Sequence, residues 1–471
     1  MSNYYASQKR GTGKYLFFLI VGMILAGIIY IYTSERFERN KPVITISKSM
    51  HWNLHDAIPL KLNDDTGIKS YKVYLEQEGQ RVVLLKDQLL TPVKELNLEI
   101  KYPKSRRHNK EKSAKIIVET SDISYWNVLE GNSATSTTDI IIDKRKPLVN
   151  VINKSYKIAH GGSALVTFEA RDENMQDLYI ISDKGRRFEV TPFYKENFYI
   201  ALIAWPVKER SFRAYIMAKD KAGNFTKTYI PYFLKTRHYK KSKIPVSDKF
   251  LDGKIDTLSY EYYDQTVNEE AVEYNALSRT DKFRFVNEQL RNTNEERIRE
   301  IVKYKPDVEP LSSFHVNPFL PLKNSAKVGS FGDHRHYNYK KSKISEAYHL
   351  GLDLASVRAD KIKLSNGGRV LYTGSNGIYG NMPIVDHGLG LTSLYAHCSA
   401  INVSEGEIVG RGTYIANTGS TGLALGDHLH FTLMVQGEMV RPQEWMDRNW
   451  INDNITKIIA EAKKIIKANG Q

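Results

Sequence analysis

The chain reads Gly426-Asp-His-Leu-His-Phe431 at the start of an apolar segment that continues through residues 431–435. A short apolar run of this kind predicts a buried β-strand. Residues two apart in a strand project from the same face, so His428 and His430 are expected to point into the same space. The sequence therefore places two imidazoles side by side at the beginning of a core strand.

Histidines are concentrated around this strand. Seven of the 13 in the chain fall between residues 334 and 430, a clustering that packing needs do not explain. The segment His349-Leu-Gly-Leu-Asp353 adds an imidazole and a carboxylate. Two histidines and one carboxylate are a known ligand set for catalytic zinc, which keeps a fourth position open for water. The other histidine of the closing pair and His397 are then free for proton transfer.

Four motifs follow one another in this part of the chain: Phe331-Gly-Asp-His-Arg335, His349-Leu-Gly-Leu-Asp353, Tyr395-Ala-His397 and Gly426-Asp-His-Leu-His-Phe431. With these motifs in this order, residues 320–446 resemble the lysostaphin/LytM-type zinc peptidoglycan endopeptidases. The resemblance implies a compact antiparallel β-sheet domain with a groove over the metal.

Carried over position by position, the resemblance implies that His349, Asp353 and His430 bind one zinc ion per chain. His397 and His428 match the family's catalytic histidines, which transfer protons and stabilise the tetrahedral intermediate. Zinc chemistry of this kind suits a neutral histidine as the base.

The resemblance also implies substrate contacts from Arg335, Asn381 and Tyr395. The chain departs from the family pattern at three positions, which are Asp427, Thr432 and Cys398. None of the three is a predicted ligand, so the departures bear on substrate detail more than on activity.

A few polar residues of this region are expected to act differently. His387, in an Asp-His-Gly turn, is predicted to be structural, whereas His334 and His336 are candidates for substrate contact. Cys398 is the single cysteine of the chain, which excludes an intramolecular disulfide, and it is expected to be buried. Asn317 is a hypothetical latch that would occupy the metal or the groove.

The implied function is hydrolysis of amide bonds in peptidoglycan stem peptides or cross-bridges during cell-wall remodelling. The expected bond is D-Ala to meso-diaminopimelate if the wall is of the Gram-negative type. Two alternatives stay open: a non-catalytic, wall-binding activator of other hydrolases, and a zinc carboxypeptidase acting on the same substrate.

An apolar run at residues 15–33 is long enough to span a bilayer. A cleavable signal peptide is the competing interpretation, but its apolar stretch is shorter and ends in small residues. Lys9, Arg10 and Lys14 predict that residues 1–14 stay in the cytoplasm. The sequence thus predicts a single-pass inner-membrane protein with its catalytic domain in the periplasm or otherwise outside the cytoplasm.

Two segments between the apolar run and the histidine-rich region look like diverged copies of one unit. They begin with Lys-Pro at residues 41 and 146 and consist mostly of short alternating runs. Phe212, Ala214, Ile216 and Ala218 alternate before a turn at residues 220–224, which resembles the closing hairpin of an immunoglobulin-like sandwich. We expect immunoglobulin-like domains at 41–143 and 144–236 that act as spacers, with protein-partner or wall binding as an alternative.

Helical periodicity marks residues 247–305, which predict a linker of two helices with a capping box at Thr293-Asn-Glu-Glu296. Residues 451–471 predict a C-terminal helix that packs on the domain before it. The expected fold class is therefore mainly β and multidomain: a transmembrane helix, two sandwiches, a helical linker and the peptidase domain.

Charge adds a further constraint. The net charge of +15 and the pI near 9.3 indicate either a solvated basic surface or an anionic partner such as wall polymers or lipid headgroups. No nucleic-acid-binding motif accompanies the charge, so nucleic acid is not an expected partner.

Overall fold

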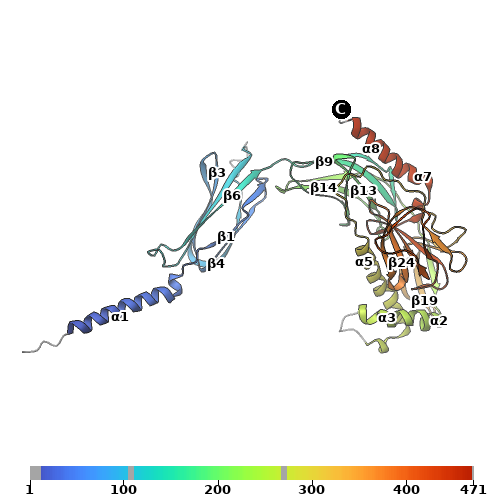
Figure 1. The fold of residues 1–471 in the computed structure, drawn as a ribbon, viewed down its shortest axis with the longest axis horizontal. Coiled ribbons are helices and arrows are strands. Elements are labelled where there is room, and N and C mark those ends of the chain that lie inside the picture. The colour runs from blue at the N-terminus through green and yellow to red at the C-terminus, as the bar shows by residue number, and fades with distance from the viewer. Residues whose placement is uncertain (1–11, 104–110, 267–272, 469–471) are drawn as a thin grey trace, which may run out of the picture. The chain divides into compact units, whose positions relative to one another are not determined.

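The computed structural model describes residues 12–103, 111–266 and 273–468 and is mainly β, as the sequence predicts (Figure 1). The chain divides into two compact units. The first extends to Lys146 and includes Lys219–Asn224, and the second comprises Pro147–Ala218 and Phe225–Gln471. Most of the predicted cytoplasmic segment 1–14 and the last three residues of the predicted C-terminal helix lie outside the described residues.

The first unit opens with the apolar helix. Its residues 14–33 have a mean hydropathy of 2.4 and are long and apolar enough to cross a membrane. The strands that follow fill residues 43–142, here called the first β-domain, within the predicted range. The elements of the unit are α1 (Thr12–Thr33), η1 (Glu35–Phe37), β1 (Val43–Thr45), β2 (Ser49–Trp52), β3 (Ile58–Gln77), β4 (Gln80–Ile100), β5 (Ser113–Asp122) and β6 (Ser133–Ile142).

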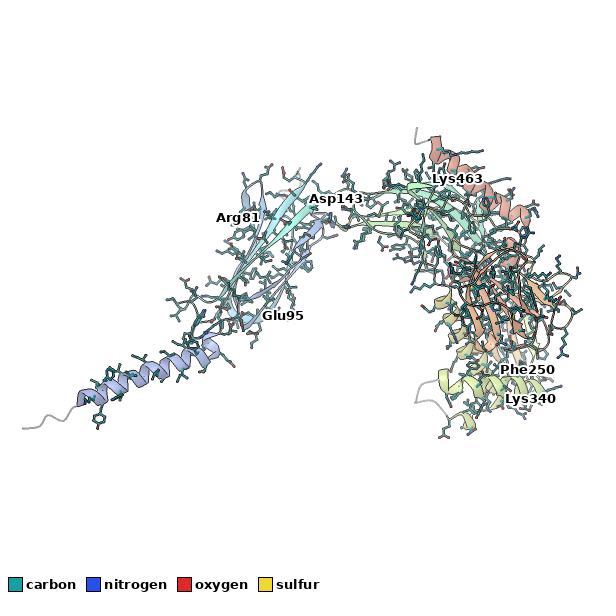
Figure 2. All side chains as sticks on the ribbon, in the orientation of Figure 1. Arg81, Glu95, Asp143, Phe250, Lys340 and Lys463 are labelled. Carbon is teal, nitrogen blue, oxygen red and sulfur yellow. The ribbon has the colours of Figure 1, made fainter. Side chains whose placement is uncertain are left out.

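The first β-domain is one sheet of six described strands in the order β1-β3-β5-β6-β2, with β4 paired to β3. The turn between the long strands β3 and β4 uses Glu78 and Gly79, both with positive φ. Arg81 and Glu95, labelled in Figure 2, lie in different parts of β4. The core of the domain gathers alternate residues of these strands, including the fully buried Leu62 and Val73.

The second β-domain, residues 148–235, contains two four-stranded sheets that share one core. Their strand orders are β11-β10-β14-β15 and β12-β13-β9-β7, and β16 pairs with β8. The predicted closing hairpin is β14–β15, where Ala214, Ile216 and Ala218 are buried. The strands are β7 (Leu148–Lys154), β8 (Lys157–Ala159), β9 (Ser163–Arg171), β10 (Met175–Ser182), β11 (Arg187–Glu189), β12 (Thr191–Phe193), β13 (Lys195–Ala204), β14 (Ala214–Asp220), β15 (Phe225–Ile230) and β16 (Phe233–Lys235).

The helical segment packs against the sheet of the predicted peptidase domain. Phe283, Val286 and Leu290 share a core with Ile384 and Leu394 of that sheet, so the helices do more than connect two domains. The elements are β17 (Lys241–Pro245), α2 (Asp248–Phe250), η3 (Leu251–Ile255), α3 (Asp256–Thr266), η4 (Tyr274–Ala276), α4 (Arg279–Arg284), η5 (Phe285–Leu290) and α5 (Arg291–Ile301).

The predicted capping box at residues 293–296 is wrong. Helix α4, the π-helical turn η5 and α5 run without a break from Arg279 to Ile301. The side chain that begins this helix is Ser278, which accepts a hydrogen bond from the amide of Asp281.

The peptidase domain is built on an eight-stranded sheet in the order β18-β21-β29-β25-β24-β23-β27, with β30 paired to β29, and two smaller sheets, β17-β19-β20 and β22-β28-β26. Its elements are β18 (Ala326–Gly329), β19 (His334–Tyr339), β20 (Ser342–Tyr348), β21 (Leu352–Ala355), β22 (Lys361–Lys363), β23 (Gly368–Ser375), η6 (Gly377–Tyr379), β24 (Asn381–Asp386), β25 (Leu391–Ala396), β26 (Ala400–Ile401), β27 (Ile408–Val409), β28 (Tyr414–Asn417), β29 (Leu429–Val435) and β30 (Glu438–Val440).

The C-terminal helices pack on the second β-domain, and not chiefly on the peptidase domain as expected. Helix α8, which carries the labelled Lys463 in Figure 2, contacts β7 and β9. The Asn153 side chain donates to the carbonyl of Ile458, and Ser155 donates to that of Asn454. The elements are α6 (Pro442–Trp445), α7 (Arg448–Ile451), η7 (Asn452–Thr456) and α8 (Lys457–Ala468).

Candidate metal centre

Three predicted ligands meet in the peptidase domain. Asp353 on β21 is the direct antiparallel partner of His430 on β29, and His349 precedes β21. His349 Nε2 lies 2.9 Å from Asp353 Oδ1 and 3.0 Å from His430 Nδ1, and the last two atoms are 2.9 Å apart. All three residues are buried. The two strands therefore bring two imidazole nitrogens and one carboxylate oxygen into a triangle.

The far nitrogen of each imidazole is engaged by a hydrogen bond. His349 Nδ1 lies 2.9 Å from the carbonyl oxygen of Ser330, which accepts its proton. His430 Nε2 lies 3.1 Å from the hydroxyl of Thr432, which itself donates to the carbonyl of Leu350. These contacts assign the tautomers and leave His349 Nε2 and His430 Nδ1 with free lone pairs that face each other.

Such a triangle is unfavourable without a cation, because two lone pairs and a carboxylate oxygen approach to about 3 Å. A tetrahedral zinc ion with ligands at about 2.0–2.1 Å separates its ligand atoms by roughly 3.3 Å. The observed spacing of 2.9–3.0 Å is close to that value. The residues present therefore fit zinc.

The electrostatics of the ligands agree with this fit. Burial alone would raise the pKa of Asp353, but hydrogen bonds and charge from His349 and His430 hold it well below its usual range. Burial lowers the pKa of His430 to about 4, despite the opposing effect of Asp353. The carboxylate is thus ionised and His430 is neutral, which are the forms that bind metal.

Two glycines make room for the ligands. A side chain at Gly329 would place its Cβ 2.1 Å from Asp353 Oδ2, and one at Gly351 would place its Cβ 2.6 Å from His430 Nε2. Gly351 stands inside the His349-Leu-Gly-Leu-Asp353 motif. The motif therefore requires glycine for close approach of the backbone to the second ligand strand.

The two predicted catalytic histidines lie next to the triangle and line the same cavity. His397 Nδ1 is 2.8 Å from the carbonyl oxygen of Thr421, and His428 Nδ1 is 2.8 Å from that of Gly426. Their rings are 4.8 Å apart, and His428 Nε2 lies 3.7 Å from Asp353 Oδ1. Each ring thus has its Nδ1 proton on a backbone carbonyl and its Nε2 available as a base.

Arg335 reaches the ligand carboxylate. Its Nη2 lies 3.1 Å from Asp353 Oδ2, and its Nε lies 3.6 Å from Asp333. Because Asp353 Oδ1 faces the histidines, the guanidinium fixes the carboxylate through the other oxygen. Arg335 also lines the cavity, so a contact with substrate stays a prediction.

Tyr395 cannot contact a substrate in this structure. It is fully buried, where it packs against Phe431 and accepts a hydrogen bond from Ser393. The alternation that should bring Tyr395 and His397 to one face ends with β25, and His397 has φ +66°. Asn381 is half-buried, and its amide donates to Thr421, which leaves a substrate contact untested.

Four other residues have structural contacts. His387 bonds the carbonyl of Gly367 and the hydroxyl of Ser393, and burial lowers its pKa to about 4. Cys398 is fully buried, and burial raises the pKa of its thiol to about 12. His334 and His336 lie on the face of β19 that meets Glu346, each 3.4 Å from its carboxylate.

Asn317 does not occupy the metal site. Its amide nitrogen donates to the side chain of Asn366, and its carbonyl accepts from the same side chain. The latch hypothesis therefore has no support in this conformation.

A cavity of about 540 Å³ opens over the triangle. One wall comes from the peptidase domain and contains Tyr348 and Leu425, and another comes from the helical segment and contains Phe250, Phe283 and Arg291. Phe250 is labelled in Figure 2, near the turn at Lys340. Sequence reasoning missed this second wall, because nothing in the helical periodicity says which surface the helices cover.

Residues 347–442 match the profile of peptidase family M23. The DD-carboxypeptidase/endopeptidase Mpg of Neisseria meningitidis serogroup B is 37% identical over 94 residues, which cover 20% of this chain and 22% of Mpg. The peptidoglycan DD-endopeptidase ShyA of Vibrio cholerae serotype O1 is 32% identical over 120 residues, which cover 26% of this chain and 27% of ShyA.

The murein hydrolase activator NlpD of Escherichia coli K12 is 36% identical over 104 residues, which cover 22% of this chain and 27% of NlpD. All three matches thus span about a quarter or less of each relative.

Proposed function

Because residues 347–442 form a domain of peptidase family M23, we propose that this chain is a zinc endopeptidase that hydrolyses amide bonds in peptidoglycan stem peptides or cross-bridges. The observation that carries the proposal is the triangle of His349 Nε2, Asp353 Oδ1 and His430 Nδ1, beside two histidines with a free Nε2. If the wall is of the Gram-negative type, the expected bond joins D-Ala to meso-diaminopimelate.

His349, Asp353 and His430 would hold the zinc ion, which supplies Lewis-acid polarisation of the scissile carbonyl when bound. The other groups of the site belong to the chain. Nε2 of His428 or His397 accepts the proton that the attacking water loses and returns it to the departing amine nitrogen. The water oxygen joins the carbonyl carbon, the C–N bond breaks, and the products are a carboxylate and an amine.

The two histidines are suited to complementary roles. Their Nδ1 protons are held by the carbonyls of Thr421 and Gly426, so neither ring can turn away from the cavity without losing a hydrogen bond. Burial, together with the neighbouring histidines His430 and His428, lowers the pKa of His397 well below its usual value. A neutral His397 is able to accept a proton and then, once charged, to donate a hydrogen bond to a developing oxyanion.

The similarity to NlpD raises a second candidate, a non-catalytic activator of other wall hydrolases. A complete set of predicted ligands and both predicted catalytic histidines support the enzyme instead. A carboxypeptidase that removes terminal D-Ala would use the same chemistry, and the name of Mpg covers both activities.

We further propose that α1 holds the chain in the inner membrane and leaves the rest of the protein on the periplasmic side. The length and hydropathy of residues 14–33 support an anchor. A location at the envelope agrees with a peptidoglycan substrate. Whether the first β-domain binds protein partners stays a prediction.

The test is incubation of residues 34–471 with purified muropeptide dimers, followed by mass analysis of the products. Wild type loaded with zinc should give monomers, and His430→Ala should give none and should lose its one bound zinc. His315→Ala is the control, because His315 is exposed and belongs neither to the triangle nor to the cavity lining. It should retain both zinc and cleavage.

Two further substrates separate the alternatives. Removal of only the terminal D-Ala from a pentapeptide monomer, with dimers left intact, would identify a carboxypeptidase. Intact dimers despite one bound zinc, together with faster cleavage by an added wall amidase, would identify an activator and contradict the enzyme.

A further inference from the structure

A second group of candidate ligands lies in the first unit, far along the chain from the peptidase domain. Glu38, Asp64 and Asp122 each offer a carboxylate oxygen, and these oxygens lie within 4.8 Å of one another. Glu38 directly follows η1, the short helix after α1. Asp64 lies within β3, and Asp122 is the last residue of β5.

Local hydrogen bonds hold two of these carboxylates in place. Asp64 Oδ1 accepts from the amides of Thr66 and Gly67 at 2.9 and 2.7 Å. Asp122 accepts from the amide and the side chain of Asn132, both at 2.8 Å. The positions of these two carboxylates are therefore fixed by the fold of the sheet.

Two of the three carboxylates have a buried oxygen without a hydrogen-bond partner among the described residues. Asp64 is 8% exposed, yet its Oδ2 is buried and has no hydrogen-bond partner among the described residues. Glu38 Oε1 is buried and likewise has none in the described part of the chain. A buried carboxylate oxygen is stabilised by a positively charged partner, so each of these atoms is placed to bind a cation.

The charges around Glu38 also favour a bound cation. Burial raises the pKa of Glu38, and the negative charges of Asp64, Asp122 and Asp65 raise it further. These neighbours repel the ionised form. Arg39, the nearest cation along the chain, lies over the rings of Tyr32 and Trp126.

We propose that Glu38, Asp64 and Asp122 bind a hard divalent cation, Ca²⁺, at the junction between α1 and the first β-domain. Only oxygen donors are present, which is the preference of Ca²⁺ and Mg²⁺ and not of zinc. Two oxygens bound to one Ca²⁺, each at about 2.4 Å, are at most about 4.8 Å apart, and the three carboxylates meet this limit. The wider and less regular coordination of Ca²⁺ suits ligands from three separate segments.

The cation would tie the chain after α1 to the sheet. The carbonyl of Glu38 already accepts hydrogen bonds from Ser124 Oγ at 2.6 Å and Asn132 Nδ2 at 3.0 Å. The carbonyl of Arg36 accepts from the amide of Tyr125 at 2.7 Å. A bound ion adds a link from Glu38 to β3 and β5, and so holds the junction rigid.

The second β-domain carries the same hydrogen-bond pattern around an aspartate. Asn224 donates its amide and its side chain to Asp220, each at 2.8 Å, as Asn132 does to Asp122. Asp172 corresponds in the repeat to Asp64. The recurrence shows that the aspartate–asparagine pair is a regular feature of this repeat.

The test uses the full chain in detergent micelles, stripped with a chelator and reloaded with one zinc so that the catalytic ligands are occupied. Calcium is then titrated by calorimetry, with magnesium in a second series. Asp64→Asn keeps the Oδ1 acceptor for the turn and removes the charge, so it should bind one calcium fewer than wild type. Asp65→Asn, an exposed neighbour with the same change of charge, should bind as wild type does.

Trypsin gives a second readout, because Arg36 and Arg39 flank Glu38. Calcium should slow release of the region after α1 in wild type and in Asp65→Asn, and should have no effect in Asp64→Asn. Comparison between variants removes any effect of calcium on the protease. Muropeptide cleavage should be unchanged in Asp64→Asn, so the proposal stands or falls independently of the proposed function.

Three results would overturn the proposal. They are the absence of calcium binding in the zinc-loaded wild type, an equal loss in Asp65→Asn, and magnesium binding that equals or exceeds calcium binding. A Glu38→Gln variant, which keeps the backbone carbonyl, guards against misfolding of Asp64→Asn. It should lose the same one calcium while its β-sheet circular dichroism matches that of wild type.

Discussion

The two β-domains begin alike and are buried differently. Both open with Lys-Pro and a short alternating strand, at residues 41 and 146. In the first, residues 58–65 of β3, the counterpart of β9, alternate between buried and more exposed positions, which is typical of a sheet with one face in water. In the second, every residue of β9 is buried except Arg171. A strand buried on both faces needs cover on its outer side as well.

The cover of β9 comes from the C-terminal part of the chain. Helix α8 and η7 contact β9, and Trp445 donates its indole proton to Ser163. The second β-domain therefore shares its core with the peptidase domain, whereas the first has a core of its own. The difference teaches that two copies of one repeat take different roles according to what covers their outer faces. The first has a core of its own, and the second shares its core with the M23 domain.

Truncation of the chain should give the largest effect on folding and on cleavage of muropeptides. Residues 147–471 should fold and cleave muropeptides, because they retain the second β-domain with its cover. Residues 236–471 should fail to fold, because Trp445 and the apolar face of α8 would be exposed. Solubility, circular dichroism and product yield measure the outcome. Folding of residues 236–471 would contradict the shared core, and unfolding of residues 147–471 would contradict the independence of the two units.

Two buried tryptophans allow a test of whether the two units unfold separately. Trp445 and Trp52 are both almost fully buried, one where the second β-domain meets the peptidase domain and one in the core of the first β-domain. Replacement of a buried tryptophan by alanine costs about 3–5 kcal/mol. Scanning calorimetry should show that Trp445→Ala lowers only the transition that tracks loss of activity, and that Trp52→Ala lowers only the other one. A shift of both transitions by either variant would show that the two units unfold together.

The triangle of candidate ligands could be predicted from sequence because local spacing decides it. His428-Leu-His430 in a strand fixes a common face, and His349 with Asp353 adds the rest of the set. The same periodicity also points to Thr432, two residues beyond His430, whose hydroxyl engages His430 Nε2. The two-residue spacing between His430 and Thr432 is visible in the sequence, although the family pattern marks Thr432 only as a departure.

Other features depend on tertiary contacts that the sequence does not reveal. Tyr395 is in the core because the strand ends before His397 and the backbone turns there with positive φ. Asn294, inside the supposed capping box, lies mid-helix, where its side chain accepts from the amide of Ile378. The wall that the helices give to the cavity and the position of α8 on β9 likewise follow from packing between distant segments.

A buried carboxyl group, that of Glu444, lies where the second β-domain meets the peptidase domain. Its ionisation should make the stability of the second unit depend on pH. Glu444 is buried there and accepts from the amide of Ser163, and burial raises its pKa to about 7. Since the unfolded carboxyl ionises near pH 4.5, the folded state holds the proton more tightly. This stabilisation is complete below about pH 4.5 and is lost as pH rises to about 7, a change of roughly 3 kcal/mol.

Glu444→Gln should remove this part of the pH dependence. Urea unfolding of residues 147–471 between pH 4.5 and 8 should show a flatter profile for the variant than for wild type. The exposed Glu461→Gln, with the same change of charge, should keep the wild-type slope. Equal slopes for Glu444→Gln and wild type would show that Glu444 ionises alike in the folded and unfolded chain.

The smallest effect should come from Gln436, whose side chain bridges the same two domains. Its Nε2 donates to the carbonyls of Glu189 and Leu202 at 2.9 and 3.0 Å, and its Oε1 accepts from the amide of Glu189 at 2.7 Å. Gln436→Ala should cost about 1–2 kcal/mol in the unfolding free energy of residues 147–471, because these backbone groups lose their partners.

Gln436 also has φ +49°. Gln436→Asn favours that backbone conformation but is one methylene shorter, so a similar loss would assign the effect to the bridge. Wild-type stability in Gln436→Asn would assign it to the backbone instead, and the join would then depend on apolar packing around Trp445.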